Sequence, residues 1–485
     1  MNMENNEKNN IIGYCTGETS MMKVSFVSKK PITVGEYVYL EYNNQIIIGM
    51  IESLFRGTKS LDEEILNPDA IEKILTINGD IDEYIRGNIT ILGDEDNLEI
   101  PKTPAKPGTE VKKAGKEILK KVFEKENAIR IGTLVSEPEV PLKLDVNKMV
   151  SRHLAILAMT GAGKSNATSI IIDRLLEVNG SILIFDMHGE YKSLTERTDA
   201  IAQSFKIAGP GDLETSNDDA LFLPYWLLNR EELLSMILDR SDSNAPNQAS
   251  RFTLHIRSLK EATLTREGKT DTLKTFTVDS PIPFLMTDLL ELLKDDDTRK
   301  GMGKNGPIKG EWEGKLTRFI SRLETKIADK TYGFMFQPTD EIQMYNWLAN
   351  LACRLLGYQS GQKGIKIIDF SEVPSDVLPV VTGTLARLLY DIQFWMNEQK
   401  RTPFTLVCDE AHLYLPIKED ADAVQKQALY NFERIAKEGR KYGVSILAVS
   451  QRPADVSKTI LSQCNNFVVL RLTNERDKGV IKNLL

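Results

Sequence analysis

Hydrophobic and polar positions follow two different patterns before and after about residue 130. In the first part, short stretches alternate between apolar and polar residues, which is typical of half-buried strands. Two of them are joined by an Asn43-Asn44 pair that is typical of a tight hairpin turn. These four stretches are Met22–Val27, Gly35–Tyr42, Gln45–Ile51 and Tyr84–Leu92. Short strands this close together predict a small β-barrel over residues 1–100, for which we expect no catalytic role.

The second part of the chain contains continuous apolar runs separated by helical patterns. Such runs are typical of parallel strands buried on both faces of a sheet. They cover 153–158, 181–186, 365–370, 404–409, 445–449 and 467–472. The long interval after the second run carries apolar residues at helical spacing, so we expect an inserted helical subdomain at about 225–345. The predicted fold class is α/β: a parallel-sheet core over residues 131–485, with a small N-terminal barrel and a helical insertion.

The segment between these two parts is rich in proline and charge. Pro101–Gly108 contains three prolines and a glycine, which predicts a linker, and the Lys/Glu-rich residues 110–127 predict a helix. We therefore assign residues 101–130 to a linker and helix.

Composition narrows the class of protein. The 485 residues are 41% hydrophobic and 27% charged, as in soluble globular proteins, and no apolar run reaches the length of a membrane span. The polar N-terminus has no secretory signal pattern, so we expect a cytoplasmic protein. The scattered cysteines indicate reduced core residues rather than a disulfide or zinc framework. The net charge of −8 argues mildly against a protein that coats DNA, so any contact with DNA must be local.

One motif carries phosphate chemistry. Residues 158–165 read Ala-Met-Thr-Gly-Ala-Gly-Lys-Ser between an apolar run and a helical pattern, which is the context of a phosphate-binding loop. Gly161 and Gly163 allow the backbone to curl around phosphates, Lys164 supplies a cation, and Ser165 supplies a hydroxyl for Mg²⁺. The alternative is a chance Gly-Lys-Ser sequence, but it would explain neither the apolar run before the motif nor the helical pattern after it. The motif departs from the usual pattern at its first position, where Ala158 replaces glycine. The residues predicted to bind ATP are Thr160, Gly161, Ala162, Gly163, Lys164, Ser165 and Asn166.

The run at 404–409 ends in Asp409 followed by Glu410. Asp409 fits the Mg²⁺ shell, and Glu410 fits a base that polarises the attacking water. An Asp-Glu pair is common alone, but together with the phosphate loop it indicates hydrolysis. Gln451 ends a further run, beside the catalytic strand, and suits a γ-phosphate sensor. The alternative is an amide that bonds a loop.

Several other polar residues have two interpretations. Arg434 and Arg440 could reach the γ-phosphate of a neighbouring subunit, or could form a solvated basic face. The Asp186–Tyr191 segment could assist the metal or the water, or could anchor its loop. His188 and His412 lack zinc-ligand spacing, and we assign them no metal role.

The order of these motifs, together with Leu223-Pro224-Tyr225-Trp226 and Ser450-Gln451-Arg452-Pro453, resembles HerA, of the HerA/FtsK group of P-loop ATPases. The resemblance implies a RecA-like ATPase core, a HAS barrel at the N-terminus and a homo-hexamer that moves double-stranded DNA. It implies catalytic roles for Lys164, Glu410 and Gln451, and metal binding by Ser165 and Asp409. It also places Arg440 and Arg152 at the subunit interface.

The resemblance also implies partners. Relatives work with a NurA-like nuclease in DNA end resection, or with a sirtuin-like or nuclease effector in antiphage defence, docked on the barrel face. HerA proteins continue past the position of Leu485 with a segment that clasps the next subunit, so we expect either a truncated chain or an absent latch. The alternative function is a hexameric ATP-binding scaffold that activates an effector without translocation. A secretion or conjugation ATPase fits less well, because those proteins often carry membrane helices.

Overall fold

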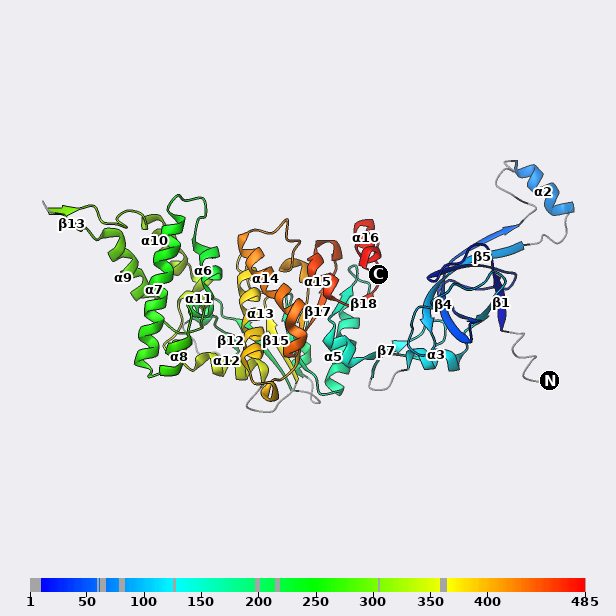
Figure 1. Cartoon of the computed structure of the whole chain (residues 1–485), viewed down its shortest axis with the longest axis horizontal. Coiled ribbons are helices and arrows are strands. Elements are labelled where there is room, and N and C mark those ends of the chain that lie inside the picture. The colour runs from blue at the N-terminus through cyan, green and yellow to red at the C-terminus, as the bar shows by residue number, and fades with distance from the viewer. Residues whose placement is uncertain are drawn as a thin grey trace. The chain divides into compact units, whose positions relative to one another are not determined.

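The structure is a computed structural model of the whole chain (Figure 1). It describes residues 10–58, 61, 67–77, 83–124, 128–196, 201–213, 219–303, 306–357 and 364–484. The chain forms two compact units, Met1–Val146 and Asn147–Leu485, and each is considered by itself.

The first unit is built on a closed antiparallel barrel, drawn in blue to cyan in Figure 1. Its strands are β1 (Ile11–Cys15), β2 (Lys23–Ser28), β3 (Tyr37–Tyr42), β4 (Gln45–Thr58), β5 (Glu83–Asp94) and β6 (Glu110–Lys113), in the order β1-β2-β5-β4-β3-β6. Alternate residues point inward, and Phe26, Leu40 and Ile47 are fully buried in the barrel core. Asn43 and Asn44 both have positive φ, 54° and 58°, as the predicted tight turn requires.

The barrel extends beyond the predicted boundary at residue 100. β6 lies between β1 and β3 and closes the barrel, and residues 110–113 are therefore strand rather than helix. Ala105, inside the predicted linker, is buried in the barrel core, and its carbonyl accepts a hydrogen bond from Thr19 Oγ1 at 2.5 Å. The segment therefore packs against the barrel instead of separating two domains.

The rest of this unit carries short elements. They are α2 (Pro68–Ile77), α3 (Lys116–Phe123) and the antiparallel pair β7 (Ala128–Thr133) and β8 (Pro141–Asp145). α3 buries Leu119 and Val122 at helical spacing, and Leu119 packs with Ala114, Leu134 and Val140 in a second small core.

The second unit is organised around an eight-stranded parallel sheet in the order β12-β11-β15-β10-β16-β17-β9-β18. The strands are β9 (Leu154–Leu157), β10 (Ser181–Asp186), β11 (Ile201–Ile207), β12 (Ala220–Leu221), β15 (Gly364–Asp369), β16 (Phe404–Cys408), β17 (Val444–Ser450) and β18 (Asn466–Val469). All six predicted runs are strands of this sheet. β11 and β12 were not predicted, because Gln203, Ser204 and Lys206 interrupt the apolar residues of β11 and β12 is only two residues long.

Helices surround this sheet and extend past the β12 side of it. They are α4 (Val146–Ser151), α5 (Lys164–Glu177), α6 (Arg230–Ile237), α7 (Ala245–Arg266), α8 (Thr270–Thr275), α9 (Met286–Thr298), α10 (Thr317–Ala328), α11 (Gly333–Phe336), α12 (Trp347–Leu356), α13 (Leu378–Trp395), α14 (Ala423–Glu438), α15 (Lys458–Gln463) and α16 (Glu475–Leu484). α6 to α12 lie between β12 and β15 in sequence, as the predicted helical insertion requires. Within it, α7, α9 and α10 stand side by side (Figure 1), and β13 (Gly301–Gly303) and β14 (Gly306–Ile308) form a hairpin.

A buried ionic network connects the insertion to the sheet-covering helices. α6 begins with a capping box in which Glu232 N–H donates to Asn229 Oδ1 at 2.8 Å and Asn229 N–H donates to Glu232 Oε2 at 2.9 Å. The same Glu232 carboxylate accepts two hydrogen bonds from Arg387 of α13, both 2.8 Å, and one from Asn431 of α14 at 2.9 Å. One carboxylate therefore joins three helices.

Candidate active site

The phosphate-binding loop lies between β9 and α5, where the sequence predicts it. Gly161 has φ of 75° and Gly163 has φ of 95°, in the left-handed region that favours glycine. A Cβ at either position would meet no atom within 4 Å, so the backbone conformation, rather than space, selects glycine here. The N–H groups of the first turn of α5 have no partner within the helix and form an anion-binding end.

The alanine at the first position of the motif is compatible with this geometry. Ala158 is buried, and its N–H donates to Ser450 O of β17 at 3.2 Å. It therefore continues the strand contact instead of making the turn, and glycine is not required there.

The acid pair lies beside the loop. Lys164 Nζ is 3.3 Å from Asp409 Oδ1 and also donates to Glu410 Oε1, and all three residues are buried. Burial raises the pKa of Asp409 to about 6, although the Lys164 ammonium opposes the rise. Burial works against the charge of Lys164, but Asp409 and Glu410 outweigh it and raise the pKa of Lys164. The loop cation is thus held charged between the two acidic side chains.

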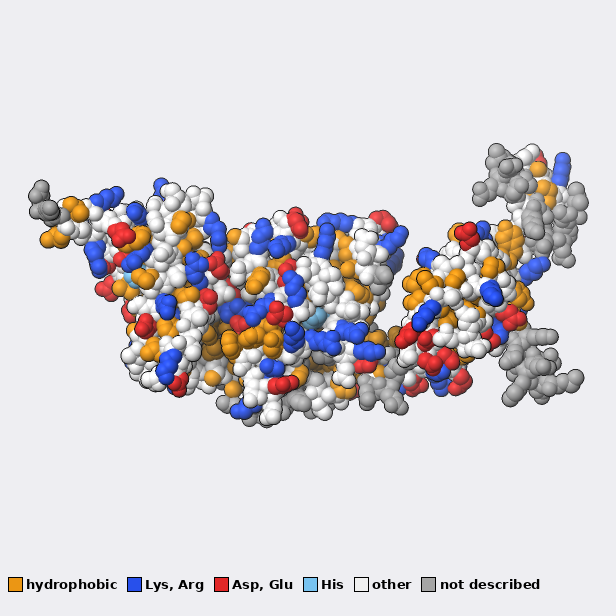
Figure 2. Space-filling model, viewed as in Figure 1, with side chains coloured by type: hydrophobic (Ala, Val, Ile, Leu, Met, Phe, Trp, Pro, Cys, Tyr) orange, Lys and Arg blue, Asp and Glu red, His pale blue; other side chains and the backbone are white. Residues whose placement is uncertain are grey.

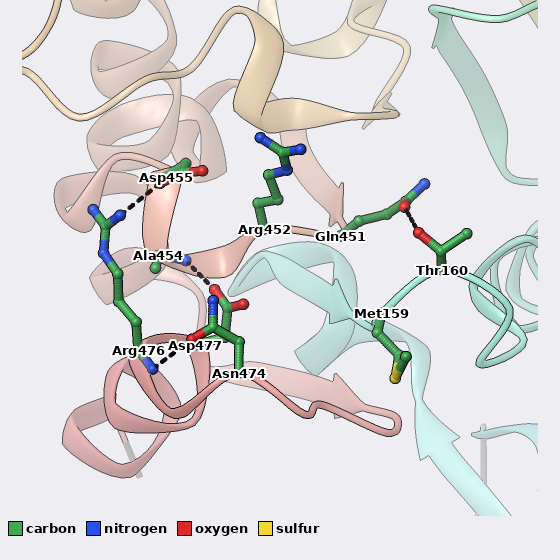
Figure 3. Close-up of a pocket in the computed structure, with 9 residues that line it drawn as sticks. All are labelled: Met159, Thr160, Gln451, Arg452, Ala454, Asp455, Asn474, Arg476 and Asp477. Carbon is green, nitrogen blue, oxygen red and sulfur yellow. Dashed lines mark hydrogen bonds and ion pairs between the residues drawn. The ribbon is translucent and has the colours of Figure 1, made fainter.

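Gln451 joins the loop to the acid pair. Thr160 Oγ1 donates to Gln451 Oε1, and Gln451 Nε2 donates to Glu410 Oε1. Figure 3 shows the Gln451 side chain reaching Thr160 from the end of β17. Glu410 has φ of 43°, a strained conformation for a residue with a Cβ, which aims its side chain back towards Lys164 and Gln451.

The side chains fit a magnesium ion carried by a nucleotide. Asp409 Oδ2 is buried without a hydrogen-bond partner, and Ser165 Oγ donates to Glu190 Oε2 at 3.1 Å. Among the described residues, no group of three or more His, Cys, Asp or Glu could hold a metal by itself. Mg²⁺ in nucleotide sites is held by one or two protein groups together with phosphates and water, and this donor set matches that requirement.

The segment after β10 chiefly anchors its own loop. The Asp186 carboxylate accepts hydrogen bonds from the backbone N–H groups of His188, Glu190 and Tyr191 at 3.3, 3.1 and 3.0 Å. Burial raises the pKa of Asp186 despite these bonds. Glu190 alone of these acids contacts the phosphate-loop residue Ser165.

The three candidate arginines are placed differently. Arg434 pairs with Asp391 at 3.3 Å, and its guanidinium lies over the rings of Tyr390 and Phe394, so its own chain holds it. Arg440, in the 3-10 turn Gly439–Tyr442, and Arg152, just before β9, are exposed. Within the described residues neither of these two has an ion-pair partner.

Two further histidines, His153 and His412, were not predicted to have a role. His153 is buried between β9, β17 and α14: Ile446 N–H donates to its Nδ1 and its Nε2–H donates to Ala436 O, both at 2.9 Å. Burial lowers its pKa, which fits this neutral tautomer. His412 lies 3.3 Å from Glu410 Oε2. In the sequence, only the position of His412 two residues after Glu410 pointed to the site.

A polar pocket of about 440 Å³ continues from the loop towards α16. Figure 3 shows Arg476 paired with Asp455, and Asp477 accepting the N–H of Ala454, on the wall opposite Gln451. The pocket opens beside Thr160, so the segment after β18 forms part of the surroundings of the site.

Fold and site together define a nucleotide-binding P-loop ATPase of the RecA-like type. The loop lies on β9, the acid pair on β16, and the polar amide on the strand between them.

Comparison with known proteins identifies the family. Residues 129–389 match the family described as "Helicase HerA, central domain", and residues 12–97 match the HAS barrel domain. The chain belongs to the HerA helicase family. It is 31% identical to "Probable helicase MJ1565" of Methanocaldococcus jannaschii, over 98% of this chain and 83% of that protein. It is 28% identical to "DNA double-strand break repair helicase HerA" of Saccharolobus solfataricus, over 97% of this chain and 84% of that protein.

Among solved structures, VirB4 of Thermoanaerobacter pseudethanolicus aligns with a TM-score of 0.47 and 16% identity, over 74% of this chain and 88% of that one. None of the helices in the described parts of this chain has the length and apolar character of a transmembrane segment.

Proposed function

We propose that this protein hydrolyses ATP with Mg²⁺ and uses the energy to move double-stranded DNA through a homo-hexameric ring. The observation that carries the proposal is the convergence of Lys164 with Asp409, Glu410 and Gln451, which follow it in the chain by 245 or more residues. Relatives that this chain covers over 84% and 85% of their length are named as double-strand break repair helicases, which supports DNA as the substrate.

The residues divide the chemical work. The loop from Thr160 to Asn166 holds the phosphates, and Lys164 leaves the acid pair to neutralise their charge. Mg²⁺, when bound through Ser165 and Asp409, supplies further neutralisation of the phosphate oxygens. Glu410 then accepts a proton from the attacking water, and Gln451 fixes the position of Glu410 relative to the loop.

Hydrolysis across a ring needs a group from the neighbouring subunit. Arg440 and Arg152 are exposed and free of ion pairs within the described part of the chain, whereas Arg434 is not. We assign the interface role to the first two.

DNA binding is compatible with a net charge of −8 if the contacts are local. Figure 2 shows Lys and Arg side chains gathered in a row on the visible face of the second unit, around α5 and the lower end of α14. Such a row suits phosphate contacts that weaken with salt.

The proposal is tested by ATPase rates with and without linear duplex DNA, at low and high salt, with oligomer size measured by native mass spectrometry. We expect a hexamer whose ATPase is stimulated by duplex DNA at low salt. Glu410→Gln should bind ATP without turnover, and Lys164→Ala should do neither. Absence of ATP turnover in every oligomer would overturn the proposal.

The second candidate function is a scaffold that activates an effector docked on the barrel, either a NurA-like nuclease or a sirtuin-like antiphage protein. The closed barrel as part of a separate compact unit favours a docking role. The Glu410→Gln variant discriminates between the two functions. Effector activation that survives loss of hydrolysis, but not loss of Lys164, would establish the scaffold.

A further inference from the structure

His412 occupies a defined position behind the proposed catalytic glutamate. It lies in the 3-10 turn Ala411–Leu413 that directly follows Glu410. Its Nδ1 is 3.3 Å from Glu410 Oε2 and 3.4 Å from Ser450 Oγ, and its side chain is 16% exposed. Ser450 Oγ in turn accepts the N–H of Arg452 at 3.0 Å. The imidazole therefore stands between the end of the catalytic strand β16 and the end of β17.

The protonation state of His412 follows from these neighbours. Burial lowers its pKa, and nearby Arg452 and Lys164 act in the same direction, against Glu410 and Asp455. The ring is thus neutral at pH 7. A neutral ring with a carboxylate facing Nδ1 carries its proton on Nδ1, because two acceptors would otherwise repel each other.

The two oxygens of Glu410 have different partners. Oε1 is bonded to Lys164 and Gln451, whereas Oε2 is buried without a hydrogen bond and faces the Nδ1 of His412. Lys164 is the partner that a bound phosphate would remove. Catalytic hydrogen bonds are often long before substrate binds and shorten in the complex.

We propose that His412 is a positioning residue that holds Glu410 Oε2 once ATP has drawn Lys164 away, so that Oε1 stays aimed at the attacking water. This inference rests on the proposed ATP hydrolysis. The 3.3 Å contact then closes to a hydrogen bond from Nδ1–H to Oε2, and Gln451 holds the other oxygen.

The loop after His412 is rigid enough for this task. Tyr414 and Leu415 are fully buried, Leu415 O accepts the N–H of Ser457 at 2.9 Å, and Pro416 forms a bridge with Val456. The turn that carries His412 is therefore fixed to the segment after β17, which also carries Gln451. His412 and Gln451, which contact the two oxygens of Glu410, are thus carried by segments that are bonded to each other.

Three substitutions separate positioning from general packing. His412→Asn places an amide N–H where Nδ1 stands, His412→Gln places it one carbon further, and His412→Ala removes the donor. Leu413→Gln, at the adjacent residue that is 41% exposed, is the matched control. Steady-state ATP hydrolysis by the full-length protein gives kcat and KM, and thermal melting reports folding.

We expect His412→Gln and His412→Ala to lower kcat about 10–100-fold with little change in KM, as for other residues that orient a reacting group. His412→Asn should stay within about threefold of wild type, because its amide N–H can still donate to Glu410 Oε2. Leu413→Gln should match wild type.

If the wild-type protein hydrolyses ATP, the proposed function stands, and two results would then overturn the inference about His412. One is a kcat for His412→Gln and His412→Ala equal to wild type. The other is equal loss in all three His412 variants with a lowered melting temperature, which would show a packing role. A wild-type protein without ATPase would instead refute the proposed function itself.

Discussion

The ionic network around Glu232 offers a test of what holds the helical insertion on the ATPase core. Arg387 donates to both Glu232 oxygens and to Leu227 O, and it lies 3.3 Å from Asp391. The Arg387 and Glu232 side chains are only 9% and 5% exposed. Burial opposes the charge of Arg387, but Glu232 and Asp391 raise its pKa. Arg387 therefore keeps its charge, and its contact with Glu232 is almost hidden from solvent.

Arg387→Met removes the cation and leaves the Glu232 carboxylate buried with Asn431 and the capping N–H groups. Removing one partner of a buried ion pair costs about 3–5 kcal/mol. An unfolding entropy of roughly 2 cal/mol/K per residue makes that a fall of about 4–7 °C in the melting temperature of a unit this long. The double variant Glu232→Gln/Arg387→Met keeps a capping acceptor but no unpaired charge, so it should recover at least about 1 kcal/mol over the single variant.

Tryptophan fluorescence is the appropriate assay, because all four tryptophans belong to the second unit: Trp226, Trp312, Trp347 and Trp395. Melting curves and urea titrations then report this unit without the barrel. A melting temperature for Arg387→Met within about 1 °C of wild type, or a double variant no better than the single one, would refute the assigned role of the network.

Three further predictions concern buried or strained groups. Burial lowers the pKa of Lys260 from 10.5 to about 7, so between these pH values the unfolded chain binds more protons than the folded one. The free energy of unfolding, measured by urea titration, should therefore rise from pH 7 to 10.5. The Lys260→Met variant should show no such rise. Gly163→Ala, at φ of 95°, should cost about 1–2 kcal/mol and weaken ATP binding measured by calorimetry. Lys164→Ala leaves Asp409 and Glu410 without their cation, so its melting temperature at pH 7 should lie below that of wild type. This difference in melting temperature, the gap, should narrow towards pH 5, where Asp409 takes up a proton. A gap that does not depend on pH would contradict this account.

The sequence predicted well the features that neighbouring residues determine, and predicted poorly those that depend on residues distant in the chain. The phosphate loop is specified by consecutive residues, and Gly161 and Gly163 have the positive φ values that their type suggested. Continuous apolar runs identified six strands of the sheet. The failures were non-local: composition suggested a linker, but β6 pairs with β1 and β3 from the start of the chain, and Ala105 is bonded to Thr19, 86 residues away.

His412 shows the same limit within the site. Its sequence position excluded a zinc ligand but said nothing of Glu410 Oε2, because that contact depends on the left-handed backbone of Glu410 and on Ser450 of another strand. Arg434 was equally ambiguous until Asp391, Tyr390 and Phe394 were found around it.

Strand order explains why Gln451 occupies its central place. β17 pairs with β16 on one side and with β9 on the other, so its carboxyl end lies between the acid pair and the phosphate loop. A side chain at that end can bond both, as Gln451 does with Glu410 and Thr160. Gln451 and Lys164 thus both connect Glu410 with the phosphate loop. Because the segment after Gln451 is bonded to the turn of His412 and lies beside α16, this edge of the sheet gives one route by which nucleotide state could reach the surface.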